Sequence, residues 1–357
     1  MDQRVRGPSS HVKLGNVVIS MVELEKNWLR ISATCKELLS SERIPSEEVT
    51  VSLLAMCNSL VELLVLDPSA LPKELIDGAT SGLLHLDDAS AEKAPTHQVS
   101  PVIQRMKNDL SLLAYSVVKH PPVFISPKVL EIYTKIQANL GRPETLPEVF
   151  HLYSHKPLPQ QDTMPIKYSK SNPNSISNSI PPAVAELALQ TAIDSKQLVA
   201  AMDIVESAYT TTSYLRAKFI RKLLLPATGV VAAPMAAYVA ASQLAALQSS
   251  MDAEMATKVA FAGILAYTFF TGTIGVVAIT TANDQMDRVT WAPGVPLRER
   301  YMREEERAAI DKISSSWGFK ESWRRGEEEG EDWDALREWI GHKGMILDRV
   351  ELKEGME

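Results

Sequence analysis

Two long stretches without a single charged residue lie close together in the second half of the chain. The first spans residues 223–251 and the second spans residues 259–283. About 20 apolar residues are enough for a helix to cross the hydrocarbon core of a bilayer. Core helices of soluble proteins usually keep one polar face, and neither stretch has one. The sequence therefore predicts a transmembrane hairpin over 223–283, with a hairpin buried in a soluble core as the alternative.

Small residues in the two stretches predict how the helices pack. They recur at short helical spacings: Gly229, Ala233, Ala237 and Ala240 in the first stretch, and Gly263, Ala266, Gly272 and Gly275 in the second. Close backbone approach matters in lipid, because helices there gain little from burial against each other. Pro226 and Pro234 interrupt the first stretch, and Pro234 predicts a kink. Neither stretch holds an ionisable side chain, which argues against an ion pathway made from this hairpin alone.

The charges that flank the two stretches predict their orientation. Four basic residues precede the first stretch, namely Arg216, Lys218, Arg221 and Lys222. The connecting loop carries Asp252 and Glu254 before its first basic residue. Positive flanks stay on the side from which insertion begins. We therefore expect both chain termini on one matrix or cytosolic side, and the loop on the opposite side.

The chain before residue 156 has a helical pattern of apolar residues. Helices are expected over about 14–39, 46–64, 100–119 and 126–141, with a short one over Leu71–Ile76. Ser126 and Pro127 are typical of a helix start, and Gly141 of a helix end. The alternation typical of strands is almost absent, so the sequence predicts an all-α fold.

A change of composition separates this region from the next helices. Residues 156–182 are rich in Ser, Asn and Pro, which predicts a linker or an extended strap with nothing to bury. Helices resume over Ala183–Ile193 and Lys196–Tyr209, joined by a turn at Asp194–Ser195. The predicted order is an N-terminal segment (1–13), a helical domain (14–155), the linker (156–182), a helical hairpin with a basic flank (183–222), the transmembrane hairpin (223–283) and a helical tail (284–357).

Two segments resemble a known class of helical repeats. The run IDSKQLVAAMDIVESAY (Ile193–Tyr209) has a short polar turn before an L-x-x-A-x-x-I-V face, and resembles the second half of a pentatricopeptide-type hairpin. The segment Val129–Pro157 similarly resembles a helix-turn-helix unit of helical-repeat proteins of fungal mitochondria. The resemblance implies a helical scaffold at the mitochondrial inner membrane. No regular repeat period is visible, so no nucleotide-reading residues are assigned, and an irregular scaffold with two hairpins is the alternative.

The first thirteen residues bear on the compartment. They hold Arg4, Arg6 and Lys13 against Asp2 alone, and they lack an apolar run. A secretory signal requires such a run, so this segment is not one. It weakly resembles a mitochondrial transit segment, and a flexible N-terminus is the alternative.

The tail is acidic and unusually rich in tryptophan. It holds five of the six tryptophans in the chain: Trp291, Trp317, Trp323, Trp333 and Trp339. Loose acidic tails rarely concentrate tryptophan, so we expect a charged helix with internal ion pairs over Leu297–Ile313 and a final helix over 332–341. Trp317, Trp323, Trp333 and Trp339 are candidate partner anchors, with packing onto the protein's own helical domain as the alternative. Trp291 is expected at the membrane interface.

We identify no catalytic, cofactor-binding or metal-binding residues in the sequence. His151 and His155 lie one helical turn apart but have no third ligand nearby in sequence, and His85 with Asp87 is a weaker pair. Motifs for a nucleophilic serine, a phosphate-binding loop and a dinucleotide site are absent. The acidic run 327–329 is interpreted as a solvated face.

Composition narrows the class of protein further. Cys35 and Cys57 are the only cysteines, too few for a disulfide framework or a four-cysteine zinc site. The net charge of −7 argues against a generally basic nucleic-acid binder. The basic residues over 216–222 are sufficiently explained by membrane topology, although RNA or anionic lipid could also bind there.

Together these features predict a non-enzymatic, membrane-anchored scaffold or assembly factor at the matrix face of the mitochondrial inner membrane. Its role would lie in organellar gene expression or respiratory-complex assembly, as the helical-repeat resemblance implies. The expected partners are membrane lipid and proteins on the matrix or cytosolic side, without a cofactor. Two alternatives stay open: a membrane-tethered RNA-binding helical-repeat protein, and a subunit of an endoplasmic-reticulum or other membrane complex.

Overall fold

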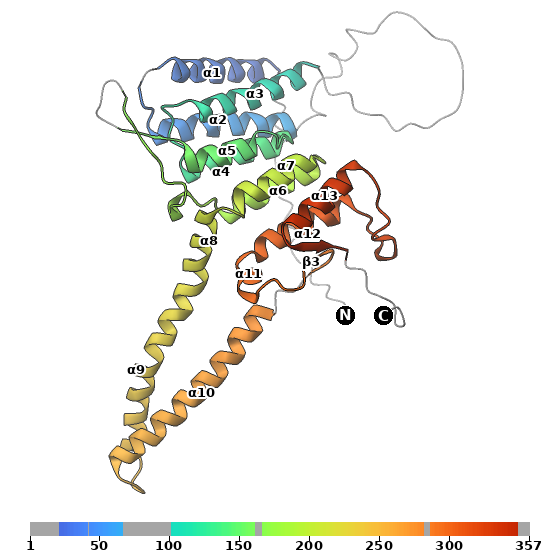
Figure 1. Cartoon of the computed structure of the whole chain (residues 1–357). Coiled ribbons are helices and arrows are strands. Elements are labelled where there is room, and N and C mark those ends of the chain that lie inside the picture. Colours follow the sequence, from blue (N-terminus) through green and yellow to red (C-terminus); the bar gives the residue numbers. More distant parts are fainter. Residues whose placement is uncertain (1–20, 42, 67–100, 161–165, 282–285, 349–357) are drawn as a thin grey trace, which may run out of the picture.

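The chain folds into a helical head from which two long helices project. The computed structural model describes residues 21–41, 43–66, 101–160, 166–281 and 286–348. In this part of the chain the structure is helical except for two short antiparallel strand pairs, so the predicted all-α class is confirmed. Figure 1 shows the two projecting helices, α9 (Leu225–Ala246) and α10 (Ala253–Thr281), which leave the head apart from each other and converge towards the tip. The predicted segment 1–13 and the predicted helix Leu71–Ile76 lie outside the described residues.

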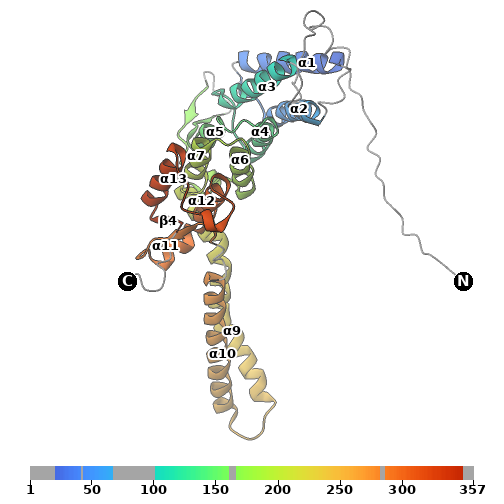
Figure 2. The same cartoon turned by 90° about the vertical axis from the view of Figure 1, so that its right-hand side faces the viewer.

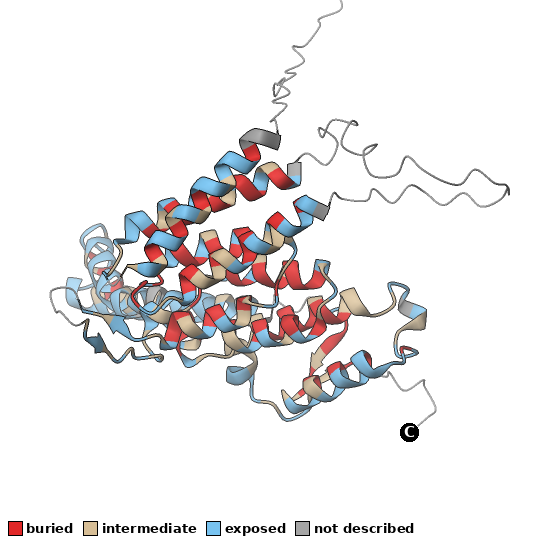
Figure 3. Cartoon of the chain, turned by 90° about the horizontal axis from the view of Figure 1, so that it is seen from above, coloured by how far each residue is buried: buried red, intermediate tan, exposed pale blue. Residues whose placement is uncertain are grey.

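Five helices form the end of the head that lies farthest from this hairpin. They are α1 (Met21–Ser40), α2 (Glu47–Leu66), α3 (Pro101–Lys119), α4 (Pro127–Leu140) and α5 (Leu146–His155). Figure 3 shows buried positions on the sides of these helices that face one another. Leu53 and Leu54 of α2 and Leu130 and Ile136 of α4 are fully buried at the centre of the core. Leu53, Leu130 and Ile136, which belong to the helical apolar pattern of the sequence, are therefore core residues, whereas Leu29 and Val49 of the same pattern are exposed.

Helix α4 begins and ends where its local sequence predicts. The Ser126 side chain accepts a hydrogen bond from the Val129 backbone N–H at 3.3 Å, and Pro127 is the first helical residue. Gly141 follows the last turn with a φ of 66°, a left-handed conformation that glycine adopts readily. Both ends of this helix are thus set by residues next to them in the chain.

The Ser/Asn/Pro segment is a strap that is hydrogen-bonded to the head. It forms a small strand pair, β1 (Leu158–Pro159) with β2 (Tyr168–Ser169), and a short 3-10 turn, η2 (Ile176–Asn178). The Tyr153 hydroxyl donates to the Ser177 carbonyl at 3.1 Å, which ties the strap to α5. The expectation that the segment buries nothing is wrong at Ile180, which is 3 % exposed and belongs to the core.

The next helices carry the chain from the head into the hairpin. Helices α6 (Pro182–Asp194) and α7 (Leu198–Ala208) match the predicted pair and pack against each other. Helix α8 (Thr212–Phe219) follows and continues through a π-helical turn, η3 (Ile220–Leu224), directly into α9. The π-turn changes the helical register where the hairpin leaves the head.

The tail folds back onto the head as a compact unit. Strand β3 (Val289–Trp291) pairs with β4 (Met345–Leu347) and places Val289 opposite Leu347. Three further helices and a 3-10 turn complete the unit: α11 (Leu297–Met302), α12 (Glu304–Trp317), η4 (Ser322–Arg324) and α13 (Glu331–His342). Helix α13 confirms the final helix that the sequence predicted.

Two predictions about the tail are wrong. The single helix expected over Leu297–Ile313 breaks at Arg303, where φ is −104° and ψ is 15°. At this break the Arg303 guanidinium donates to the Lys343 carbonyl at 3.0 Å, a contact that sequence spacing does not reveal. Trp291 does not lie at a membrane interface, because β3 places it in the tail's own core at 7 % exposure.

Candidate membrane anchor

Two of the described helices are long and apolar enough to cross a membrane. One is α2, over Glu47–Val65, but Leu53 and Leu60 place it in the core of the head. The other is α10, whose apolar stretch Ala253–Ala278 is almost entirely unburied, with Ala256 as its buried residue. Its neighbour α9 has a shorter apolar stretch, Val231–Ala246. The candidate anchor is therefore α10 together with α9.

Large apolar side chains are exposed along both helices of the hairpin. On α9, Val231 and Met235 are each 75 % exposed, and on α10, Phe269 is 79 % and Phe270 is 66 % exposed. Figure 2 shows the two helices projecting away from the head. Apolar surface of this extent is rare on a soluble monomer and marks a contact with a membrane or a partner.

Alanines make the contact between α9 and α10. The buried residues of this contact are Ala237, Ala241, Ala245 and Ala256. The first three recur every fourth residue of α9 and so form one stripe along it. The Tyr238 and Phe261 rings pack edge to face nearby, with 6.1 Å between their centroids. Small side chains let the two backbones approach closely, as helix pairs in lipid require.

The glycines predicted to pack between the helices lie outside this contact. A methyl group added at Gly229, Gly263, Gly272 or Gly275 would have no atom within 4 Å. Helices α9 and α10 diverge towards the head (Figure 1), and Gly229, Gly272 and Gly275 lie in the parts of the helices nearest the head. Small-residue packing is therefore confirmed for Ala237 and wrong for the four glycines and for Ala240 and Ala266, which are exposed.

Hydroxyl groups on the hairpin bond to their own helix. The hydroxyls of Thr268, Thr271 and Thr273 each donate to the carbonyl four residues earlier at 2.8 Å. Ser242 likewise donates to the Val239 carbonyl at 2.8 Å. Such internal bonds let hydroxyls enter hydrocarbon without an unpaired donor.

A buried lysine fixes the start of the hairpin to the tail. The Lys218 side chain is 3 % exposed and pairs with Glu305 of α12. Its Nζ also donates to the carbonyls of Tyr301 at 2.7 Å and Met302 at 3.0 Å, at the end of α11. Lys222 reaches the same carboxylate, with 2.7 Å between its Nζ and Glu305 Oε1. One acidic residue of the tail thus binds two basic residues at the base of α9.

The four predicted flanking basic residues therefore have different surroundings. The structure brings Lys218 and Lys222 together on Glu305, whereas Arg216 and Arg221 make other contacts. Arg216 donates to the Asn174 carbonyl of the strap at 3.0 Å, and Arg221 Nε donates to the Ala217 carbonyl at 3.3 Å. The sequence does not reveal the role of Glu305, because it lies 83 or more residues from its partners.

Proximity of opposite charges stabilises the ionised forms at this junction. Burial alone would raise the pKa of Glu305, but hydrogen bonds from Lys218 and Lys222 lower it below its ordinary value. Burial lowers the pKa of Lys218, and the pair with Glu305 opposes that effect. Such a pair is costly to break from one side, because the remaining charge stays buried.

A second buried cation fixes the chain after the hairpin. The Arg288 side chain is fully buried and donates to Glu328 Oε1 at 2.7 Å and to Asp348 Oδ1 at 2.9 Å. Asp311 of α12 accepts the backbone N–H of Arg288 at 2.7 Å and of Val289 at 2.8 Å. The tail therefore binds the start of the hairpin through Glu305, and it binds its own first residues, which follow the hairpin, through the cluster around Arg288.

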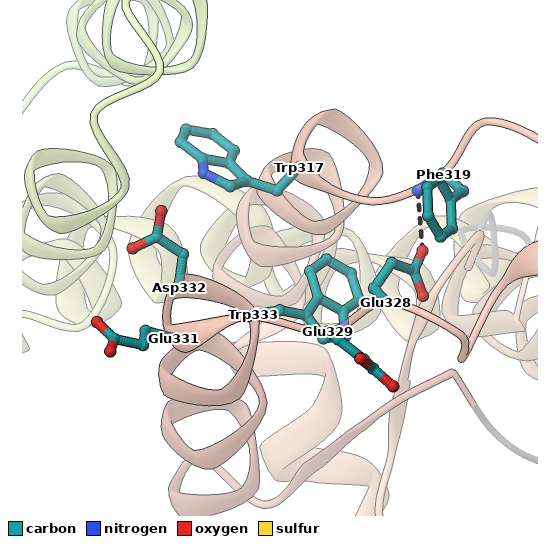
Figure 4. A pocket seen from close by; sticks show the side chains of 8 residues that line it. Trp317, Phe319, Glu328, Glu329, Glu331, Asp332 and Trp333 are labelled. Carbon is teal, nitrogen blue, oxygen red and sulfur yellow. Dashed lines mark hydrogen bonds between the residues drawn. The ribbon is translucent and has the colours of Figure 1, made fainter.

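The four tryptophans predicted as partner anchors differ in exposure. Trp333 is 5 % exposed, beneath the guanidinium of Arg288, and Trp323 is 76 % exposed. Trp339 Nε1 donates to Glu206 of α7 at 3.2 Å, and Trp317 lies under Lys196 of the head. Figure 4 shows Trp317 and Trp333 beside an open cavity that also bears Glu329, Glu331 and Asp332. Trp317 and Trp339 thus join the tail to the head, as the alternative interpretation expects.

The weaker candidates from the sequence make local contacts. The rings of His151 and His155 stack with 4.0 Å between their centroids. Among the described residues, no group of three or more His, Cys, Asp or Glu side chains is placed to hold a metal ion.

Cys35 and Cys57 are free and buried, and their hydrogen bond together with burial raises the pKa of the Cys57 thiol. His85 and Asp87 lie outside the described residues.

The chain matches no known protein family, no curated protein and no solved structure. The resemblance of Ile193–Tyr209 and Val129–Pro157 to pentatricopeptide-type hairpins therefore stays a prediction.

Proposed function

We propose that this protein is a non-enzymatic scaffold or assembly factor, anchored in the mitochondrial inner membrane by α9 and α10. The head and both termini would lie in the matrix, where the head presents its surface to protein partners. One observation carries this proposal: the hairpin exposes apolar side chains such as Met235 and Phe269 along its length, whereas the head has a buried apolar core. A role in organellar gene expression or respiratory-complex assembly is part of the proposal and rests on the helical-repeat resemblance.

The lengths of the two helices suit a bilayer. Helix α9 has 22 residues and α10 has 29. At about 1.5 Å per residue they measure roughly 33 Å and 44 Å. The hydrocarbon core is about 30 Å thick, so each helix is long enough to cross it, and the tip loop would emerge on the far side.

Charge supports the proposed orientation. At the tip, Lys258 pairs with Glu254 at 2.6 Å, and Asp252 adds further negative charge. At the base, Arg216 and Arg221 are exposed. Positive charge on the side of insertion supports a matrix or cytosolic head, and Arg4, Arg6 and Lys13 of the N-terminal segment support the matrix.

Fractionation of cells that express the tagged full chain tests the anchor and the compartment together. We expect the protein in mitoplasts, where it resists extraction by alkaline carbonate. A Phe270→Lys variant should shift towards the soluble fraction, because a charge at the centre of a span costs roughly 3 kcal/mol. Leu112→Lys, at a head residue that is 61 % exposed, is the matched control and should stay membrane-bound.

Three outcomes would contradict this proposal in different ways. Complete release of the wild-type chain by carbonate would exclude the membrane anchor. Recovery in microsomal membranes would keep the anchor and favour an endoplasmic-reticulum complex. Enriched transcripts after crosslinking to RNA would favour the tethered RNA-binding protein over a scaffold for proteins.

A further inference from the structure

The hairpin joins the head at a surface that combines apolar and basic side chains. Six exposed residues make up what we call the foot surface: Phe219, Ile220, Arg221, Lys222, Leu297 and Arg298. The first four end α8 and begin η3, and the last two begin α11. Leu297 is 80 % exposed and Phe219 is 47 % exposed, so large apolar side chains face outwards beside the basic ones. The surface is therefore suited to an environment that is neither bulk water nor hydrocarbon.

Internal hydrogen bonds keep the two parts of the foot surface together. Lys218 of α8 donates to the carbonyls of Tyr301 and Met302, the last two residues of α11. Figures 1 and 2 both show α11 beside the end of the hairpin that joins the head. Helices α8 and α11, which carry Phe219 and Leu297, therefore lie next to each other on the side from which the hairpin leaves.

The position of α9 and α10 in the bilayer determines how close the foot surface lies to the lipid head groups. This step rests on the proposed function, because it takes α9 and α10 as membrane-spanning. A hydrocarbon core of about 30 Å accommodates most of α9 from Leu225 onwards. Residues that precede Leu225, including Arg221 and Lys222, then lie at the level of the lipid head groups. Helix α11 lies beside them at the same level.

Charge selects the kind of lipid. Arg221 and Arg298 are exposed, and the Lys222 side chain remains 46 % exposed while it pairs with Glu305. Long basic side chains extend their apolar stems along the membrane surface and place their charge at the phosphate level. Basic residues close to a bilayer favour anionic phospholipids over neutral ones.

We propose that the foot surface binds the head-group layer of the bilayer that the hairpin spans. Leu297 enters the layer between lipids, and Arg221, Lys222 and Arg298 bind the phosphates of anionic phospholipids. The head then rests on the membrane at two contacts, the hairpin and α11, and its orientation relative to the bilayer is fixed.

A pair of labelled variants tests the position of Leu297. The full chain carrying Leu297→Cys or Leu29→Cys is labelled with an environment-sensitive fluorophore and reconstituted into phosphatidylcholine–phosphatidylglycerol vesicles. Leu29 is 65 % exposed on α1, at the far end of the head, and is the matched control. We expect a nitroxide lipid labelled near its head group to quench position 297 at least about twice as strongly as position 29. Equal quenching at the two positions, with equal access to aqueous iodide, would overturn the proposal.

A second pair of variants tests the basic side chains. Detergent-solubilised full chain is titrated with a fluorescent phosphatidylglycerol, and binding is followed by anisotropy. Arg298→Gln should weaken binding about fivefold, because one basic residue near an anionic surface contributes about that factor. Arg30→Gln on α1 is the matched control, because Arg30 also follows a leucine and is exposed but lies far from the hairpin. It should leave lipid binding unchanged. Identical affinities for both variants would exclude anionic head groups as the ligand.

A third label separates this inference from the proposed function. Phe270→Cys carries the fluorophore on α10, within the expected span. Quenching of this position by a nitroxide deep in the acyl chains shows that the hairpin is inserted. If position 270 is quenched and position 297 is not, the foot surface does not bind the head-group layer, but the hairpin is still inserted in the membrane. If neither is quenched, the anchor itself is wrong.

Discussion

Individual buried charges decide how the tail holds the hairpin. Arg288 is surrounded by Glu328 and Asp348, and Gly318 passes so close that an added methyl group would lie 1.5 Å from the guanidinium. The partners of Arg288 are 40 and 60 residues away in sequence. Sequence spacing reveals only local pairs, so this cluster was not predictable. Glu328 was in fact interpreted as part of a solvated face, and the structure corrects this because Glu328 is 7 % exposed.

The Glu328 carboxylate makes the stability of the tail depend on pH. Burial alone would raise its pKa, but bonds from the Phe319 N–H and from Arg288 lower the pKa from 4.5 to about 2. The unfolded chain therefore binds the proton more readily, and this contribution is complete above about pH 4.5 and lost as pH falls towards 2. Thermal unfolding followed by tryptophan fluorescence should show a flatter pH dependence for Glu328→Gln than for wild type. Glu321→Gln, at an exposed residue, should keep the wild-type slope, and parallel curves for all three chains would contradict the assignment.

At the scale of elements, local signals were predictable and contacts between distant segments were not. Ser126, Pro127 and Gly141 specify the ends of α4 without help from the rest of the chain. The break at Arg303 coincides with a bond to Lys343, a residue 40 positions away, and periodicity alone predicts one continuous helix. The uncharged stretches predicted the hairpin, yet which small residues face each other depends on the crossing of α9 and α10. The sequence alone therefore does not show that the alanines, and not the glycines, make the contact between α9 and α10.

The alanine stripe makes a testable prediction for the hairpin. Ala241 is fully buried against α10, whereas Ala240 beside it is exposed. Ala241→Leu should destabilise the helix pair by about 2 kcal/mol, because overpacking forces the backbones apart. Unfolding of the reconstituted chain by denaturant measures this difference. Ala240→Leu has the same volume change on the lipid side and should unfold like wild type, and equal loss in both variants would refute the stripe.

At the scale of the whole molecule, the tail acts as a clamp between the hairpin and the head. It binds the base of α9 through Glu305 and the chain after α10 through Arg288. It binds the head through Glu206, which accepts from Trp339 and Lys343. The sequence predicted the apolar hairpin, the helical class and a folded tail. It did not predict the clamp, because every one of these bonds joins residues that are distant in the chain.

Loss of one carboxylate should loosen the clamp. Glu305→Gln leaves Lys218 charged and buried without its partner, which should destabilise the junction by about 2 kcal/mol. Amide hydrogen exchange of the reconstituted chain should rise in α8 and α11 and remain unchanged in α2 and α4. Glu131→Gln breaks the exposed pair with Lys135 and should leave exchange as in wild type. Unchanged exchange in α8 would mean that the clamp does not depend on Glu305.

Cysteine accessibility in sealed mitoplasts tests most directly that the hairpin crosses the bilayer with the head on one side. Ser250→Cys lies at the exposed tip and Leu29→Cys at the opposite end of the head. An impermeant maleimide should label position 250 in intact mitoplasts and position 29 only after detergent is added. Labelling of both positions before detergent, or protection of position 250, would contradict the proposed topology.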